Sequence, residues 1–336
     1  MAPPRQQAEL MDELVAEILV RVPPDEPAHL VRAALVSKAW RRLLSDPAFL
    51  RRYRSFHRAP PLLGFLHNHY TGGAGSVPSF IPTAPASPFP QRVFGHANWT
   101  ALDCRHGRVL FHISGGWLNL IVWDPITGDR HALPEPSVPC GGCYNAAVLC
   151  AVRGCDHLDC HGGPFVVVLA GNGSTGRFLQ ALVYSSEAGA WNASAYLGPG
   201  YYLTCKPSAV IRDDIFFVLV PWDTILRYNL GKNCLSIIHP PEAHEYEGGV
   251  ALMPVEDGSL GLASVKWSRL CLWSRNADTQ EVSGWVKCRA IGLDRLIPFM
   301  LHRGAEFVGS AGFGITLWSQ MLVSSRLSST QDRRGR

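Results

Sequence analysis

The stretch "LVSKAWRRLLSDPAFLRR", residues 35–52, combines regularly spaced apolar residues with a surplus of arginine. Val36, Trp40 and Leu44 recur at the spacing of one helical face. The Asp46–Pro47 pair ends this helix and suits the N-cap and first position of a further short helical element. The stretch therefore predicts helices whose apolar side chains form a core while the arginines remain in water.

A first amphipathic helix is predicted before this stretch. Its apolar residues recur every four positions, with two more beside them: Leu10, Leu14, Ile18 and Val22, then Val15 and Leu19. Three prolines break the pattern because proline lacks the amide hydrogen that a helix interior needs: Pro23, Pro24 and Pro27. A helical module of about 50 residues buries little surface, so we expect contact with a partner to stabilise it.

The rest of the chain has a different character. Residues 72–90, GGAGSVPSFIPTAPASPFP, follow neither the helical nor the strand period and predict a loop or linker. Short apolar segments follow, bounded by Gly, Pro, Asp and Asn: GRVLFHI, LNLIVW, PFVVVLA, FLQALVY, DIFFVLV and SRLCLW. Such segments are typical of β-strands, so this half of the chain is predicted to be β.

A repeat becomes visible when the aromatic ends of these segments are aligned: Trp123, Tyr184, Tyr228, Trp273 and Trp318. They are separated by 61, 44, 45 and 45 residues. A period near 45 is typical of a four-stranded propeller blade, and residues 60–336 would hold about six. The long first interval predicts an insertion at residues 153–163. The pattern ends soon after Trp318, which leaves closure of the last blade open.

The predicted fold class is α+β and multidomain, with a mainly antiparallel, kelch-like or propeller-like repeat domain. Its predicted parts are a helical module (1–58), a Pro/Gly/Ser-rich connection (59–92), the repetitive β domain (93–325) and a flexible basic tail (326–336).

Composition narrows the function classes. The chain has 336 residues, 47% hydrophobic and 17% charged, which is enough apolar material for a sizeable core. A net charge of +4 is too mild for the whole chain to bind polyanions. The N-terminus lacks the apolar region of a secretory signal, and no apolar run approaches the ~18 residues of a membrane span. We expect an intracellular protein, cytoplasmic, nuclear or both, whose ten cysteines are thiols or metal ligands.

The insertion is the candidate metal site. Thiol and imidazole groups gather there, and a CxxC precedes them: Cys150, Cys155, His157, Cys160 and His161, after Cys140 and Cys143. These groups suit zinc, but the C-x4-C-x4-C spacing is not a standard finger and Cys150 lies in an apolar strand. We favour an ordinary loop with reduced thiols and expect no cofactor.

Two binding motifs have simpler interpretations. The basic residues of 35–58 invite a nucleic-acid interface, but there is no helix-turn-helix pattern and Trp40 falls on the apolar stripe, which favours a solvated face. GNGSTG, residues 171–176, matches GxGxxG, yet the residues after it read as a strand, which favours a hairpin turn over a dinucleotide site.

Catalytic motifs are missing from the sequence: it has no GxSxG elbow, HExxH pair or P-loop. We therefore expect a non-catalytic protein. A propeller-based hydrolase is the alternative, since propellers also host enzymes, and nucleic-acid binding through the basic helices is a weaker one.

The helical segment resembles the F-box, whose first half runs approximately LPxELxxxILxxLP. Residues 10–14, Ile18, Leu19 and the Val22–Pro23 pair match it, with Met11 where the family usually has proline. The VSKxWRxL core of the second half is matched by residues 36–43. The β half resembles the C-terminal region of plant F-box proteins in three stretches: LDCRHGRVL (102–110), VWDPITG (122–128) and GSLGLASV (258–265).

This resemblance implies a subunit of a Skp, cullin and F-box ubiquitin ligase. The F-box would dock on a Skp-family adaptor and through it on a cullin, while the β domain captures an unknown target protein for ubiquitin-dependent degradation. The residues expected to serve folding and adaptor docking are Leu10, Leu14, Ile18, Leu19, Val22, Pro23, Val36, Trp40 and Leu44.

Overall fold

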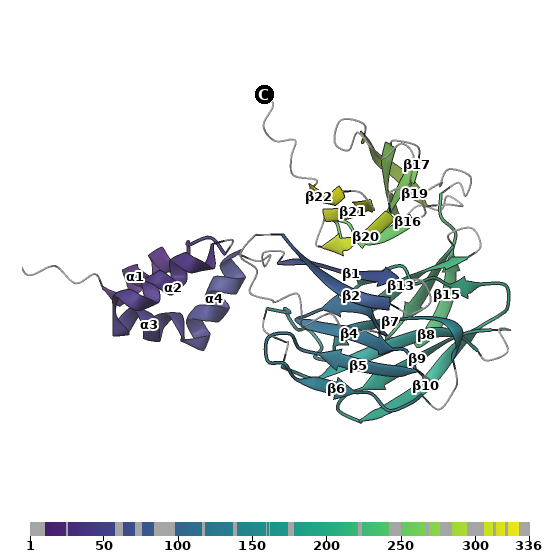
Figure 1. Cartoon of the computed structure of the whole chain (residues 1–336), viewed down its shortest axis with the longest axis horizontal. Helices are drawn as coiled ribbons and strands as arrows, with labels where there is room; N and C mark the ends of the chain where they lie inside the picture. Colours follow the sequence, from purple (N-terminus) through teal and green to yellow (C-terminus); the bar gives the residue numbers. More distant parts are fainter. Residues whose placement is uncertain are drawn as a thin grey trace, which may run out of the picture. The chain divides into compact units, whose positions relative to one another are not determined.

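The computed structural model (Figure 1) describes residues 11–24, 26–57, 63–70, 76–83, 98–115, 118–136, 140–158, 160, 162–173, 178–220, 224–241, 250–266, 269–275, 284–293, 306–311, 314–319 and 322–328. The chain forms two compact units: Met1–Leu63 with Gly154–Cys160, and Gly64–Arg153 with His161–Arg336. Within the described ranges, none of the helices has the length and apolar composition needed to cross a membrane.

The first unit holds four helices: α1 (Asp12–Leu19), α2 (Pro27–Val36), α3 (Lys38–Leu44) and α4 (Pro47–His57). Its core is formed by buried residues of α1 and α4 and by the residue after α1: Val15, Leu19, Val20 and Phe49. Trp40 and Leu44 of α3 pack against this core. Trp40 and Leu44 therefore have the predicted packing role, whereas Val36, predicted on the same helical face, is exposed at 67%.

The single helix predicted through residues 35–44 is wrong, because the chain divides there into α2 and α3. Ser37 lies between them with extended backbone, φ −152°. Its hydroxyl oxygen accepts a hydrogen bond from the Trp40 amide at 3.1 Å, which satisfies one of the free donors at the start of α3. A capping serine thus interrupts an apolar period that is otherwise continuous.

Proline acts at helix starts in this unit. Pro27, read from the sequence as part of a break, is the first residue of α2, where a missing amide hydrogen costs nothing. Pro47 opens α4 in the same way, and the Asp46 carboxylate accepts from the Ala48 amide at 2.9 Å. The predicted N-cap role of the Asp46–Pro47 pair is confirmed.

Helix α4 also closes the C-terminal end of α1 through two side chains. The Tyr53 hydroxyl donates to the Val22 carbonyl at 2.7 Å, and the His57 Nε2 lies 2.8 Å from the Val20 carbonyl oxygen. Both carbonyls lie just beyond the last turn of α1, where helical partners are lacking.

The second unit is built from antiparallel sheets whose strands are consecutive in the chain, and six are present in the described residues. The first sheet is β1 (Gly64–Tyr70) with β2 (Ser76–Pro82). The second is β3 (Trp99–Arg105), β4 (Arg108–Ile113), β5 (Asn119–Trp123) and β6 (Arg130–Ala132). The third is β7 (Cys140–Cys150), β8 (Phe165–Gly173), β9 (Leu179–Ser185) and β10 (Ala190–Leu197).

Three further sheets follow in chain order. The fourth is β11 (Tyr202–Leu203), β12 (Ala209–Ile211), β13 (Asp214–Val220), β14 (Ile225–Asn229) and β15 (Cys234–Ile238). The fifth is β16 (Val250–Pro254), β17 (Leu260–Lys266), β18 (Arg269–Arg275) and β19 (Trp285–Gly292). The sixth is β20 (Glu306–Ala311), β21 (Gly314–Ser319) and β22 (Leu322–Ser328). This arrangement confirms the predicted α+β fold class with a propeller-like second half.

Neighbouring sheets pack face to face, which explains the uninterrupted apolar runs. In β8, Val167 and Leu169 pack in a cluster with Leu110 and Val122 of the second sheet. Val168 packs on the other side with residues of the fourth sheet. Alternate side chains of a strand point to opposite faces, so a sheet covered on both sides requires every position to be apolar.

The repeat predicted from the aromatic residues is confirmed by their strand positions. Four of them lie in the second-to-last strand of successive four- or five-stranded sheets, and the fifth lies in β21, the second-to-last strand of the three-stranded sheet: Trp123, Tyr184, Tyr228, Trp273 and then Trp318. Each of the first four is paired with an aliphatic residue of the preceding strand: Val109, Val167, Ile215 and Leu262. The same register in successive sheets shows that the period reflects one repeated structural unit.

The loop predicted over residues 72–90 is wrong in part, because β2 forms there and pairs with β1. Ser76, Pro78 and Phe80 are buried while the residues between them are half-buried, which is the period of a strand. In the described residues β2 pairs with one strand only, a position that tolerates proline. The domain boundaries at residues 58, 92 and 325 stay predictions, and of the predicted tail only residues 326–328, in β22, are described.

Candidate functional site: an apolar surface on the helical unit

Helix α1 presents a row of apolar side chains to solvent. Met11, Leu14 and Ile18 have exposed fractions of 63%, 47% and 57%. Their spacing of three and four places them on one side of the helix, while Val15 and Leu19 face the core. The helix is therefore apolar on two sides, and its own unit covers only one of them.

Helix α2 carries a second exposed set: Val31, Leu35 and Val36, with exposed fractions of 61%, 80% and 67%. We call five residues of α1 and α2, together with Met11 at the N-cap of α1, the apolar helix surface: Met11, Leu14, Ile18, Val31, Leu35 and Val36. Of the fourteen exposed large hydrophobic side chains in the described residues, these six lie within residues 11–36. Exposed large apolar side chains are thus more concentrated in this segment than in the rest of the described residues.

The residues predicted for folding and adaptor docking fall into two groups. Leu14, Ile18, Pro23 and Val36 are exposed. The others within the described part pack in the core of the helical unit: Leu19, Val22, Trp40 and Leu44. Leu10 lies outside the described residues.

Three members of the surface were not among the predicted docking residues: Met11, Val31 and Leu35. Pro27 was read as a break, so residues 27–34 were given no helical face on which Val31 could be placed. Recognising Pro27 as a helix start would have predicted α2 and its outward residues.

The basic residues of this unit are partly balanced by carboxylates. Arg51 pairs with Asp156 at 2.7 Å, and Arg52 pairs with Glu17, which also binds Arg21 at 2.6 Å. The hydrogen bond from Arg52 is the main cause that lowers the pKa of Glu17. Exposed ion pairs contribute little to stability, but they remove part of the positive charge that a phosphate backbone would require.

Of the glycine-rich stretch 171–176 the structure describes residues 171–173, which belong to strand β8. Strand β8 ends at Gly173, whose amide donates to the Phe178 carbonyl at 3.0 Å, and β9 follows as the antiparallel partner. A side chain at Gly173 would meet the Phe178 ring at 2.5 Å, so the glycine allows a close approach. The predicted hairpin is confirmed, and the helix that a dinucleotide site needs after the glycines is replaced by a strand.

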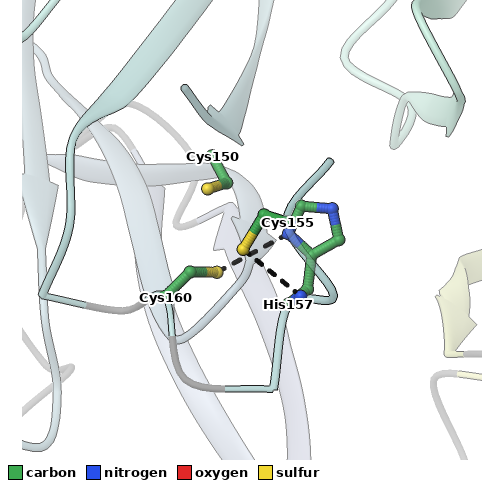
Figure 2. Close-up of side chains that lie close together, drawn as sticks. All are labelled: Cys150, Cys155, His157 and Cys160. Carbon is green, nitrogen blue, oxygen red and sulfur yellow. Dashed lines mark hydrogen bonds between the residues drawn. The ribbon is translucent and has the colours of Figure 1, made fainter. Parts of the chain in front are cut away.

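The cysteine-rich connection between β7 and β8 brings together four of the residues singled out from the sequence. The sulfur atoms of Cys150, Cys155 and Cys160 and a ring nitrogen of His157 all lie within 4.8 Å of one another (Figure 2). His161 and the side chain of Cys140 lie outside the described residues, and Cys143 is exposed and is not part of this group.

Comparison with known families gives the class of the protein. Residues 12–57 match the F-box-like family model, and residues 100–303 match the model described as F-box protein AT5G49610-like, beta-propeller. The chain is thus an F-box protein with a C-terminal propeller domain, an architecture that serves substrate recognition. Because the second model covers more than half of the sequence, the chain belongs to the AT5G49610-like family of F-box proteins.

Solved structures give more distant similarities. A structure of YCF48 bound to a D1 peptide is 9% identical, with 76% of this chain and 75% of that chain covered and a TM-score of 0.42. A structure of prolyl endopeptidases is 13% identical, with 66% and 32% covered and a TM-score of 0.36. No curated protein matches the sequence significantly.

Proposed function

We propose that this chain is the substrate-recognition subunit of a Skp, cullin and F-box ubiquitin ligase. The apolar helix surface docks on a Skp-family adaptor and through it on a cullin. The observation that carries the proposal is the exposure of five large apolar side chains on α1 and α2, within the segment that matches the F-box-like model, with a sixth at Met11 just before it.

Burial of this surface supplies a driving force for docking. Transfer of one Leu or Ile side chain from water to an apolar contact stabilises a complex by about 1.5–3 kcal/mol. Apolar side chains four residues apart, such as Leu14 with Ile18 and Val31 with Leu35, are typical of an amphipathic helix that binds in an apolar groove. The core residues Leu19 and Trp40 hold the helices in place and have no share in the contact itself.

The propeller-like unit captures the target protein and has no catalytic role in this proposal. Recognition depends on segments that interrupt the repeat, such as residues 153–163, because loops on a rigid scaffold carry variable function. Ubiquitin transfer and degradation of the target then follow in the cytoplasm, the nucleus or both.

The test uses the full chain and a purified Skp-family adaptor. Leu14→Asp combined with Ile18→Asp places two carboxylates in a dry interface, where an unpaired charge costs several kcal/mol. We expect the adaptor affinity, measured by calorimetry, to fall by about a hundredfold or more. Helical content should stay unchanged in circular dichroism, because both side chains already face solvent.

Ile126→Asp is the matched control, since Ile126 is also exposed, at 69%, but lies in the second unit. This variant should bind the adaptor as the unchanged chain does. Equal affinity of the double variant and the unchanged chain would refute docking through α1. Absence of adaptor binding by the unchanged chain would refute the ligase assignment.

A further inference from the structure

The four side chains gathered after β7 have the chemistry of a metal site. Cys150 is the last residue of β7, and Cys155, His157 and Cys160 follow within the same connection. Three thiols and one imidazole are the donor set of a structural Cys3His zinc site. Oxygen donors, which Mg²⁺ and Ca²⁺ require, are missing from the group.

The distances suit a tetrahedral ion. Zinc lies about 2.3 Å from sulfur and about 2.1 Å from nitrogen, so tetrahedral angles place a sulfur and a nitrogen about 3.5 Å apart and two sulfurs about 3.8 Å apart. The Cys160 Sγ lies 3.6 Å from the His157 Nδ1. The widest pair in the group is within 4.8 Å, and side-chain rotation can close the remaining ~1 Å.

Backbone conformation in the connection favours this convergence. His157 has φ 55°, in the left-handed region that costs a non-glycine residue roughly 1 kcal/mol. Its amide donates to the Cys155 Sγ at 3.4 Å, the type of contact that stabilises a metal-bound thiolate. Figure 2 shows this contact and the one between His157 and Cys160.

The connection between β7 and β8 also has little regular structure or buried core to hold its shape. In its described part it contains no helix or strand, and of the four candidate ligands only Cys160 is buried. A bound ion can replace a core in such a segment, because the free energy of binding becomes free energy of folding. It would also fix Asp156, which lies between two ligands and pairs with Arg51.

We propose that Cys150, Cys155, His157 and Cys160 bind one zinc ion that holds the connection between β7 and β8 in shape. Composition and spacing alone favour reduced thiols in an ordinary loop. The convergence of four donors favours a metal site instead, because a cation placed among them can be bound by all four once the thiols have lost their protons.

The first measurement is the metal content of the full chain, purified under reducing conditions without a chelator. Mass spectrometry of the metal should find about one zinc per chain, and acid should release it because protons compete for the thiolates. After removal of zinc, Co²⁺ alone should restore one equivalent and give the absorption bands of tetrahedral thiolate coordination.

Variants locate the ion. Cys155→Ser and Cys160→Ser should each lose most of the zinc and the thiolate-to-Co²⁺ band, while Cys234→Ser, at an exposed cysteine in β15, should retain both. If a variant fails to fold, the Co²⁺ spectrum of the unchanged chain still decides whether thiolates bind the ion.

Two results would overturn the proposal. One is an unchanged chain that carries no zinc and gives no Co²⁺ spectrum. The other is a disulfide within the group, found by alkylation of the denatured chain as fewer than the ten thiols that the sequence contains.

Discussion

At the scale of single residues, His112 of β4 makes stability depend on pH. The Tyr144 hydroxyl of β7 lies 2.6 Å from the His112 Nδ1, and burial lowers the pKa of this imidazole. The unfolded chain takes up a proton at His112 near pH 6.5, whereas the folded chain resists it. The unfolded state then binds more protons, so stability is lost as the pH falls below about 6.5.

Urea unfolding at pH 7.5 and pH 5.5 should therefore show a larger loss of stability on acidification in the unchanged chain than in His112→Gln. The twelve other histidines are common to both proteins and cancel in this comparison. Equal losses would show that His112 does not contribute to the pH dependence.

The candidate sites could be predicted from the sequence only in part, because the sequence shows residue types but not the backbone conformation that brings them together. The types of residue in the cysteine cluster and their place in an insertion were evident from the sequence. Their convergence could not be predicted, because it depends on positive φ at His157 and Gly154. Of these two residue types, only glycine indicates a positive φ in a sequence. Among the docking residues, Ile18 and Leu19 are neighbours in sequence, yet one is exposed and the other is buried.

At the scale of elements, the break between α2 and α3 depends on one hydroxyl. Ser37→Ala removes the acceptor for the Trp40 amide and should lower the free energy of unfolding by about 1 kcal/mol, as loss of an N-cap does. Ser37→Asn keeps an acceptor and should restore most of the loss. Chemical denaturation of the three proteins measures the effect, and equal stability of all three would mean that the cap is not what separates the helices.

Helices and strands were predicted well where the apolar pattern of one element was uninterrupted. They were predicted poorly where a single capping residue or proline interrupted that pattern. The apolar run of β8 was identified as a strand because it is short and bounded by Gly and Pro, and the structure explains its apolar character, since sheets cover both of its faces. The division at Ser37 and the helix start at Pro27 were missed, since the same residue types also occur in breaks and loops. In β2 the strand period is present, but prolines and glycines around it obscure it.

At the scale of the whole molecule, four of the recurring aromatics lie in apolar clusters that join neighbouring sheets, but they are not equally buried: Trp123, Tyr184, Tyr228 and Trp273. Tyr228 is 1% exposed within a cluster that joins the third and fourth sheets, whereas Trp273 is half-buried. Tyr228→Ala should cost about 3–5 kcal/mol through the cavity it leaves, and Trp273→Ala should cost less. Differential scanning calorimetry can rank the two variants. A larger loss for Trp273→Ala would mean that burial does not govern the role of these residues.

The strands of each sheet are consecutive in the chain, so each described sheet is complete once a short stretch of polypeptide has been made. A ribosome that has released residues up to the end of β10 has already supplied every strand of the first three sheets. Each later sheet can then add to a finished neighbour as translation proceeds, without waiting for the C-terminus. The order of synthesis is thus also the order in which this repeat can assemble, from its N-terminal sheet to its C-terminal sheet.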